Sequence, residues 1–526
     1  MIETTARLLN GWGMRALSAH PPFSSSSSRS TASHLRTIAA AVAAVAVALL
    51  ALVVGPRTPH IDGRTSGDAD LAAQVRSRIS DDAGLEAVHV SVISAEGVRH
   101  AGIGSADGVV PDESTRFSLG SVTKTFTGQL MADSIARGEV AEADTVATHV
   151  PELEGTPVGG VSLLELATHH SGLPNGLDSG AEAMQILPGA NGTNLDTASF
   201  VQKIGRVSLD GRGAFTYSNI GVGLLGVALT RAAGADSWED LVTERLLKPV
   251  GMDSTVFTTL DDDPIVPEGA IRGRWGNGRD VQPNIGGTAA LPEGVSTWTT
   301  GADMARIAQA VLDGSAPGGR EALAPRAEGM KSSLLEGDDS IGYLWWSGAV
   351  DDREIYSHGG NTMWTTTSVA LDPASGRAVV VMANTHVGNV DDLAFALLNG
   401  SDRSLSTFPG NYALLIPSAV VLVVLGLWAV LRSGHLGSRL AAGIRTADLA
   451  GWAALTVAGG PWGLVPGWTY ALAIMPGAYA IASMALRWRE LSWLPGPGRP
   501  RWWLWLRLVL CLVFIGLVLF IVTPKG

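Results

Sequence analysis

Uncharged apolar runs near both ends of the chain constrain its fold more than any other feature. Residues 37–54 (TIAAAVAAVAVALLALVV) carry no charge, and neither do residues 449–486, a stretch long enough for two bilayer crossings. In lipid, a lone segment satisfies its backbone hydrogen bonds only as a helix. We therefore expect membrane-spanning helices toward both ends and a water-soluble unit between them.

The first apolar run follows a polar leader. Residues 1–36 contain a serine run and several arginines, which predicts a disordered cytoplasmic leader. Residues 37–55 are then either a transmembrane signal anchor, which we favour, or a cleaved signal peptide. Both interpretations export everything after the linker at residues 56–69.

The C-terminal region, residues 412–526, predicts a membrane domain of about four helices, preceded by a linker at residues 401–411. The expected helices cover residues 412–431, 448–466, 468–486 and 502–522. Arginines on both sides of residues 449–486 place the two ends of that stretch on one face, as a helix pair requires. The expected topology has the globular unit and the C-terminus outside the cell, with three spans as the alternative to four.

Charge and cysteine content exclude several classes of protein. The net charge is −12, so nothing offers the basic face that nucleic acids need. Cys511 is the single cysteine, which rules out an intrachain disulfide and a thiolate metal cluster. We expect no metal and no cofactor. The expected partners are a small peptide or peptidoglycan-like substrate and the lipid bilayer, with a homodimer through the membrane helices left open.

The globular unit, residues 70–400, has the pattern of an α/β (α+β) domain. A hairpin is predicted from strands at residues 86–94 and 98–104, and three further strands at residues 353–358, 365–371 and 377–382. Helices are predicted at residues 121–137 and 391–398. Strands at both ends with helices between them predict one sheet built from the two ends of the domain, with a helical subdomain inserted.

Ser121 and Lys124 form a Ser-x-x-Lys pair at the start of the helix predicted over residues 121–137. Residues i and i+3 share a helix face, so the lysine ammonium can reach the serine hydroxyl. A helix start also favours negative charge developing on the serine oxygen. No other lysine follows a serine at this spacing. The pair is a candidate nucleophile and base, with a solvated helix face as the alternative.

Tyr217 and Asn219 form a Tyr-x-Asn element 217 − 121 = 96 residues later, the only one among the six tyrosines. A phenol beside a cation can shuttle a proton, and the asparagine can hold the lysine and a substrate amide. The alternative is a core tyrosine ahead of an apolar helix at residues 220–230.

His358 and Gly360 form a His-x-Gly element, which also occurs at four other histidines. Order and context select His358, because it ends a predicted strand and leads through glycines into the next one. Glycines there let the backbone approach a substrate closely.

These three elements, in this order, resemble the serine β-lactamase and penicillin-binding protein superfamily. The similarity is to its class C-like branch, with His-x-Gly in place of Lys-Thr-Gly. It extends over residues 70–400 and includes residues 117–126 (FSLGSVTKTF), 163–174 (LLELATHHSGLP) and 357–362 (SHGGNT). The resemblance implies a β-lactamase/transpeptidase-like fold, an antiparallel sheet flanked by helices plus a helical subdomain. It also implies that His169 and His170 belong to a structural loop rather than a metal pair.

The resemblance implies a role for each candidate residue. Ser121 is the acylated nucleophile, Lys124 the base and Tyr217 the proton shuttle to the leaving group. The implied substrate-binding residues are Asn219, His358, Gly360 and Asn361. Among them, Asn219 also positions the lysine, and the backbone N–H groups of Ser121 and Asn361 form the oxyanion hole.

The departure at His358 bears on substrate. A histidine is neutral for much of the time near pH 7, so it holds a substrate carboxylate less well than lysine. The resemblance, to membrane-bound D-amino-acid peptidases in particular, therefore implies an extracytoplasmic serine peptidase or amidase acting on D-residue peptides. D-aminopeptidase and D-alanyl-D-alanine carboxypeptidase-like activities both fit. The alternatives are an esterase or transacylase of the same fold, and a β-lactam-binding sensor that is acylated without turnover.

Overall fold

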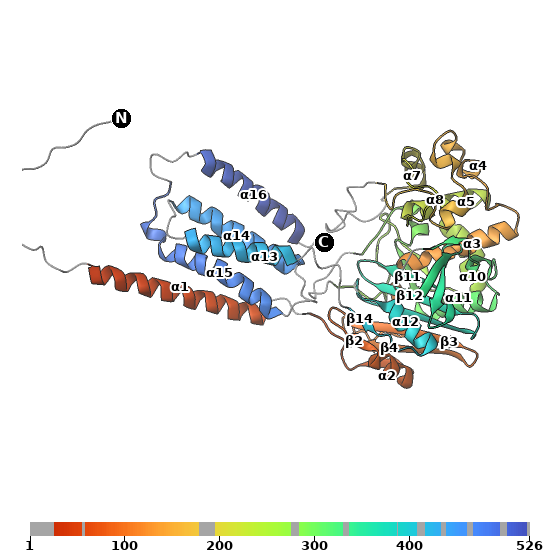
Figure 1. Cartoon of the computed structure of the whole chain (residues 1–526), viewed down its shortest axis with the longest axis horizontal. Helices are drawn as coiled ribbons and strands as arrows, with labels where there is room; N and C mark the ends of the chain where they lie inside the picture. The colour runs from red at the N-terminus through yellow and green to blue at the C-terminus, as the bar shows by residue number, and fades with distance from the viewer. Residues whose placement is uncertain are drawn as a thin grey trace, which may run out of the picture.

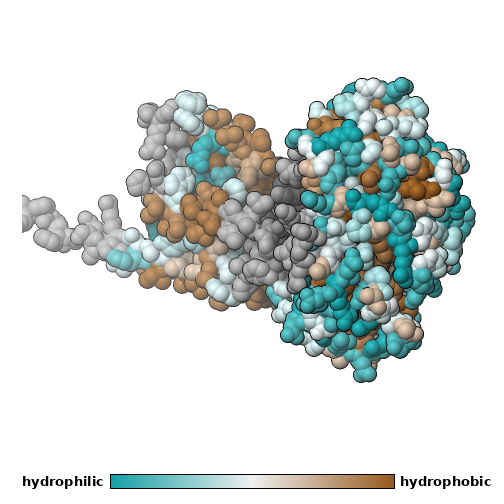
Figure 2. All heavy atoms as spheres, turned by 45° about the vertical axis from the view of Figure 1, so that its right-hand side comes forward, coloured by the Kyte–Doolittle hydropathy of each residue, from teal (hydrophilic) through white to brown (hydrophobic). Residues whose placement is uncertain are grey.

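The computed structural model describes residues 26–54, 58–177, 195–274, 283–329, 336–386, 388–407, 416–432, 438–459, 467–494 and 502–522. Figure 1 shows a bundle of long helices beside a globular α/β unit. The two parts differ in surface chemistry. In Figure 2 hydrophobic side chains gather over the helices, whereas the globular unit is largely hydrophilic.

A nine-stranded antiparallel sheet forms the centre of the globular unit in the part of the chain that the structure describes. Its strand order is β1-β4-β3-β13-β12-β11-β10-β9-β8. The strands are β1 (Thr65–Gly67), β3 (Ala87–Ser94), β4 (Gly97–Gly104), β8 (Ala327–Glu328), β9 (Glu336–Ile341), β10 (Trp346–Val350), β11 (Arg353–Asn361), β12 (Thr366–Asp372) and β13 (Arg377–Ala383). The early and late strands meet where β3 pairs with β13, Val90 opposite Val381. The predicted sheet of two sequence ends is confirmed.

Both faces of the sheet are covered, because its central strands are apolar on both sides. Val88 and Val90 of β3 pack with Leu393 of α12 (Val390–Asn399) on one face, which α2 (Ala69–Ser77) also covers. Ala87 and Ile93 point to the other face, where α3 (Lys124–Ala136) and α11 (Gly301–Asp313) contribute to the core. Successive side chains of a strand alternate between faces, so one strand supplies both cores.

A helical subdomain is inserted between β5 (Arg116–Ser118) and β7 (Thr297–Thr300), which form a small sheet with β6 (Val256–Phe257). Its helices include α4 (Val146–His149), α5 (Leu163–Ala167), α7 (Thr197–Ile204), α8 (Asn219–Ala232) and α9 (Trp238–Val242). The Ser218 hydroxyl caps α8 by accepting from the Gly221 N–H. Helix α8 is buried along most of its length, so the segment just before it is fixed in place.

The predicted hairpin, the three late strands and the terminal helix are all confirmed within a few residues. The helix predicted over residues 121–137 begins differently. It opens as a 3₁₀ turn, η1 (Gly120–Thr123), and continues as α3. The tighter turn brings the side chains at i and i+3 almost into line.

Among the described residues, five long helices lie outside the globular unit. They are α1 (Ser26–Val54), α13 (Ile416–Arg432), α14 (Arg439–Gly459), α15 (Gly467–Leu486) and α16 (Trp502–Val522). Three described segments are long and apolar enough to cross a membrane: Thr31–Val53, Trp468–Leu486 and Trp502–Leu519. The apolar part of α13, Val420–Leu431, is shorter.

The helix expected over residues 448–466 is corrected by the structure. Helix α14 begins at Arg439 and ends at Gly459, and the residues just after it lie outside the described part of the chain. Its first turns therefore include Arg445 and Asp448, of which the sequence interpretation placed Arg445 in a loop. The helix accommodates these charges because both have partners within the bundle. Arg445 lies over the Trp428 ring, and Asp448 faces Arg507.

Candidate active site

The candidate nucleophile lies on the turn that joins β5 to α3. Gly120, just before Ser121, has φ +64°, a conformation that glycine adopts without strain. A Cβ on Gly120 would also lie 3.0 Å from the backbone nitrogen of Asn361. The turn can therefore lie against β11 only because residue 120 is a glycine.

Lys124 is completely buried and is held at three points. Its Nζ donates to Ser121 Oγ at 2.9 Å and to the backbone oxygen of Glu293. It also lies 5.4 Å from the centre of the Tyr217 ring. A buried ammonium needs such partners, because burial without them is costly.

Tyr217, in the segment just before α8, contacts the same oxygen. Its hydroxyl donates to Ser121 Oγ at 3.0 Å. Ser121 Oγ therefore lies between the Lys124 ammonium and the Tyr217 phenol, although the tyrosine is 96 residues away along the chain. This geometry permits proton exchange among the three groups.

His358 lies on β11 with its ring buried. Its Nδ1 donates to the Gly359 carbonyl oxygen at 2.7 Å, so Nε2 is the bare nitrogen of a neutral ring. Burial, reinforced by the nearby charge of Lys124, lowers the pKa of His358 to about 3. The ring therefore carries no charge near neutral pH, as the sequence predicted.

Gly360 and Asn361 bring β11 against the nucleophile turn. A Cβ on Gly360 would lie 2.4 Å from the Leu119 carbonyl oxygen and 3.2 Å from Ser121 N, so a larger residue is excluded. The Asn361 side chain points elsewhere, with Nδ2 donating to the His386 carbonyl oxygen at 2.8 Å. The backbone nitrogens of Asn361 and Ser121 both lie where β11 contacts the nucleophile turn.

Asn219 is the first residue of α8 and is half-buried. Its backbone N–H donates to Asn175 Oδ1 at 3.3 Å. Among the described residues, its side-chain amide makes no hydrogen bond to Lys124. The structure therefore brings Asn219 beside the site without the direct lysine contact that the resemblance implies.

Glu293 is a residue of the site that the sequence interpretation missed. Its carboxyl is buried beside Lys124, and burial raises the pKa of Glu293 to about 8, while the lysine charge opposes that shift. Gly294 follows with φ +96°, and a Cβ there would lie 2.3 Å from the Gly120 carbonyl oxygen. The available signal was a lone acidic residue in the apolar stretch 289–295.

His169 supports the tyrosine. It is fully buried, and its ring centre lies 4.5 Å from that of Tyr217. Its Nδ1 accepts from the Ser218 N–H at 3.3 Å. Burial holds the pKa of His169 well below its usual range. The described residues contain no group of three or more metal-ligating side chains. His169 follows α5 and packs against the Tyr217 ring.

An aromatic wall borders the catalytic side chains. Phe215 and Trp346 pack edge to face with ring centres 5.4 Å apart, and Trp346 lies 6.1 Å from the His358 ring. Both aromatic residues are partly exposed. The two rings therefore form an apolar surface beside His169 and His358.

The raised pKa of Glu293 predicts a pH-dependent stability. An unfolded carboxyl titrates near 4.5 and the folded one near 8, so the free energy of unfolding falls as pH rises between these values. Glu293→Gln removes this loss. The Tm of Glu293→Gln minus that of wild type, measured on the full chain in detergent, should increase by at least about 4 °C from pH 5 to pH 8.

The control is Glu154→Gln, which removes an exposed carboxylate elsewhere on the domain. Its Tm should follow that of the wild type at both pH values. Equal pH responses for Glu293→Gln and wild type would show that the buried carboxyl does not change its protonation on folding.

Comparisons with known proteins agree with this geometry. The family described as Beta-lactamase matches residues 73–398. The chain is 32% identical over 203 residues to a beta-lactamase of Escherichia coli K12, covering 38% of this chain and 48% of that protein. It is 28% identical over 277 residues to a beta-lactamase of Yersinia enterocolitica, covering 51% and 64%. The match thus spans about half to two-thirds of each relative.

The solved structures show the same fold. The class C beta-lactamase from Rhodobacter sphaeroides superposes with a TM-score of 0.50 at 20% identity, covering 62% of this chain and 96% of that one. A second class C beta-lactamase gives a TM-score of 0.50 at 21% identity, with coverages of 59% and 89%. With the family match over most of the globular unit, the chain belongs to the beta-lactamase family of serine hydrolases.

Proposed function

We propose that this chain is a membrane-anchored, extracytoplasmic peptidase or amidase that acts on peptides with a D-residue at or beside the scissile bond. The observation that carries the proposal is the placement of Ser121 Oγ between Lys124 Nζ, at 2.9 Å, and the Tyr217 hydroxyl, at 3.0 Å. That arrangement supports acyl transfer through a serine ester.

In the proposed acylation, the Lys124 ammonium first loses a proton, and the resulting neutral amine takes the hydroxyl proton of Ser121 as the oxygen attacks the substrate carbonyl. The backbone N–H groups of Ser121 and Asn361 receive the oxyanion. Tyr217 then passes its proton to the leaving nitrogen and regains one from the Lys124 ammonium, the C–N bond breaks, and an amine departs. Water attacks the ester in the second half-reaction, releasing the acid and restoring the Ser121 hydroxyl.

Two features of the site support the choice of substrate. Because His358 is neutral, strand β11 presents no positive charge at this position that could bind a free carboxylate. The aromatic wall of Phe215 and Trp346 offers apolar contact instead. These features favour a D-amidase or D-aminopeptidase over a strict D-alanyl-D-alanine carboxypeptidase.

The proposed membrane placement is supported by the arginines and by the packing of the helices. Arg36, before the apolar part of α1, pairs with Glu490, beyond the end of α15, at 2.6 Å. Arg439, which starts α14, donates to the Trp488 carbonyl oxygen at 3.1 Å. These ends therefore lie at one level, and their arginines favour the cytoplasmic side. The globular unit would then lie outside.

Tyr217→Phe tests the proposed proton transfer, because it removes the hydroxyl and keeps the ring against His169. We expect kcat to fall about 10²–10⁴-fold while KM changes only a few-fold. Tyr356→Phe, on β11 but outside the site, is the matched control and should retain wild-type kinetics. A loss confined to KM would make Tyr217 a packing residue.

A paired kinetic assay tests the substrate class. The full chain in detergent is given D- and L-amino-acid amides, a p-nitrophenyl ester and a chromogenic cephalosporin, with Ser121→Ala as the blank. We expect kcat/KM for the D-amides to exceed that for the L-amides by about tenfold or more. Turnover of the ester alone would favour an esterase, and stoichiometric acylation by the cephalosporin without turnover would favour a sensor. Cephalosporin hydrolysis above amide hydrolysis would make the chain a β-lactamase in activity.

Reporter fusions test the topology. A phosphatase fused after Asp402 should be active, one after Ser438 inactive and one after Trp462 active, since the four-span arrangement places these points outside, inside and outside. Activity at both Asp402 and Ser438 would contradict the arrangement. Inactivity at Trp462 would favour three spans.

A further inference from the structure

Three charged side chains lie together within the helix bundle. Arg445 and Asp448 belong to α14, and Arg507 belongs to α16. Arg507 Nη2 is 3.8 Å from Asp448 Oδ2, and the Arg445 guanidinium is 4.7 Å from the centre of the Trp428 ring. The cluster carries two positive charges and one negative. Ionisable groups among membrane helices are costly, and their presence points to a function.

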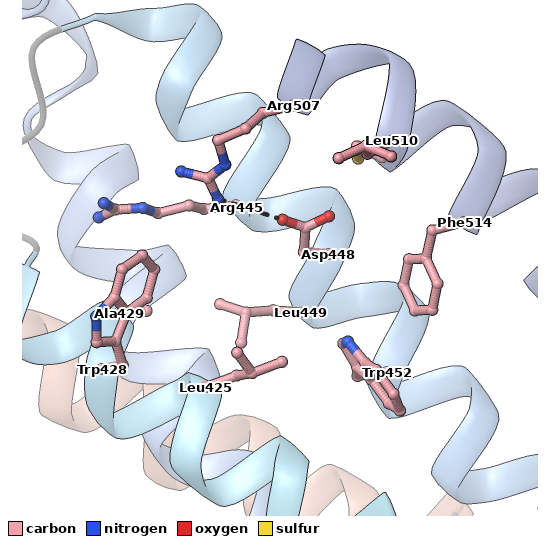
Figure 3. A pocket seen from close by; sticks show the side chains of 11 residues that line it. Leu425, Trp428, Ala429, Arg445, Asp448, Leu449, Trp452, Arg507, Leu510 and Phe514 are labelled. Atoms are coloured by element: carbon pink, nitrogen blue, oxygen red, sulfur yellow. Dashed lines mark ion pairs between the residues drawn. The ribbon is translucent and has the colours of Figure 1, made fainter. Parts of the chain in front are cut away.

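These side chains line a cavity of about 290 Å³ between α13, α14 and α16. Its charged groups gather at one end and its apolar groups at the other, as Figure 3 shows. The apolar end is formed by Leu425, Leu449, Trp452 and Phe514. Trp452 and Phe514 pack with ring centres 5.2 Å apart and border this end. The cavity therefore has a cationic mouth and an apolar floor.

The position of the mouth along the helices follows from the sequence. Arg445 lies six residues after the start of α14, and Arg507 lies five after the start of α16. At 1.5 Å per residue both are about 8–9 Å inside their helix starts. In the proposed topology these starts face the cytoplasm, so the mouth lies at the depth of the inner-leaflet head groups and upper acyl chains.

We propose that this cavity binds the anionic head group of a phospholipid, with the upper part of an acyl chain along Leu449 and Trp452. Arginine pairs phosphate through two parallel hydrogen bonds, and the net positive mouth selects an anion. The apolar floor favours a lipid over a soluble anion. The volume accommodates a head group and the first chain carbons rather than a whole lipid. The proposal rests on the proposed membrane placement.

Native mass spectrometry of the full chain in detergent tests the proposal, with dioleoylphosphatidylglycerol and dioleoylphosphatidylcholine as probes. The wild type should bind the anionic lipid at least about fivefold more tightly than the zwitterionic one. Arg507→Gln should weaken binding of the anionic lipid about fivefold, as loss of one charge predicts. Asp448→Asn should strengthen it, because the mouth then gains net positive charge.

The opposite signs expected for Arg507→Gln and Asp448→Asn separate lipid binding from a structural ion pair. If the pair were only structural, both variants would lose stability and neither would gain affinity. Arg489→Gln, an exposed arginine on the same membrane face but outside the cavity, should bind like the wild type. Equal affinity for the two lipids, or weaker binding by Asp448→Asn, would overturn the proposal.

Inorganic phosphate distinguishes a lipid from a free anion. At millimolar concentration it should not displace phosphatidylglycerol, and displacement would overturn the lipid assignment in favour of a general anion site. Membrane fractionation of the same variants separates this proposal from the placement on which it rests. If the wild type stays in the membrane fraction but shows no lipid selectivity, only the cavity proposal is contradicted. If the wild type is absent from the membrane fraction, the proposed membrane placement is contradicted.

Discussion

The burial of one ammonium group organises the site. Lys124 Nζ has no access to water, so its charge must be met by Ser121 Oγ, the Glu293 carbonyl oxygen and the face of the Tyr217 ring. These partners come from the nucleophile turn, the stretch before β7 and the segment before α8. Removing any one partner of a buried cation destabilises the fold by more than that single contact contributes, because the charge is then left uncompensated. The three segments are therefore held to each other by the lysine.

The electrostatics of the site follow from the same burial. The Lys124 charge adds to desolvation in keeping His358 neutral, and it opposes the desolvation that keeps Glu293 protonated. Near neutral pH Lys124 therefore lies beside two uncharged side chains, His358 and Glu293. In the proposed mechanism, this arrangement would stabilise negative charge that develops on the substrate in the transition state more than it stabilises the bound substrate, which is the condition for catalysis by differential binding.

The helix bundle also contains charged side chains, and their charges are compensated by neighbouring helices. Charges on α14 and α16 remain among apolar helices because Asp448 faces Arg507 and Arg445 lies over Trp428. From the sequence, these helices were predicted only as parts of a membrane domain. The cavity between them makes the bundle a candidate binding surface as well as an anchor.

Several features were determined by the sequence itself. Local backbone geometry determines the strands at residues 86–94 and 98–104, whose apolar residues alternate. It also determines that Ser121 and Lys124, three residues apart, lie on one helix face. Both were predictable, as were the long apolar helices, because hydrophobic length and periodicity are local properties.

Other features were decided only by the tertiary structure. Glu293 looked like an ordinary acidic residue, and nothing local reveals that its carbonyl oxygen would meet Lys124, 169 residues earlier in the chain. The start of α14 at Arg439 could not be predicted either. A charged residue marks the end of an apolar run in the sequence, but it can lie inside a helix when a neighbouring helix supplies its partner. A buried polar group is stable only through contacts with distant segments, so its place in the fold is set by those segments rather than by its neighbours in the sequence.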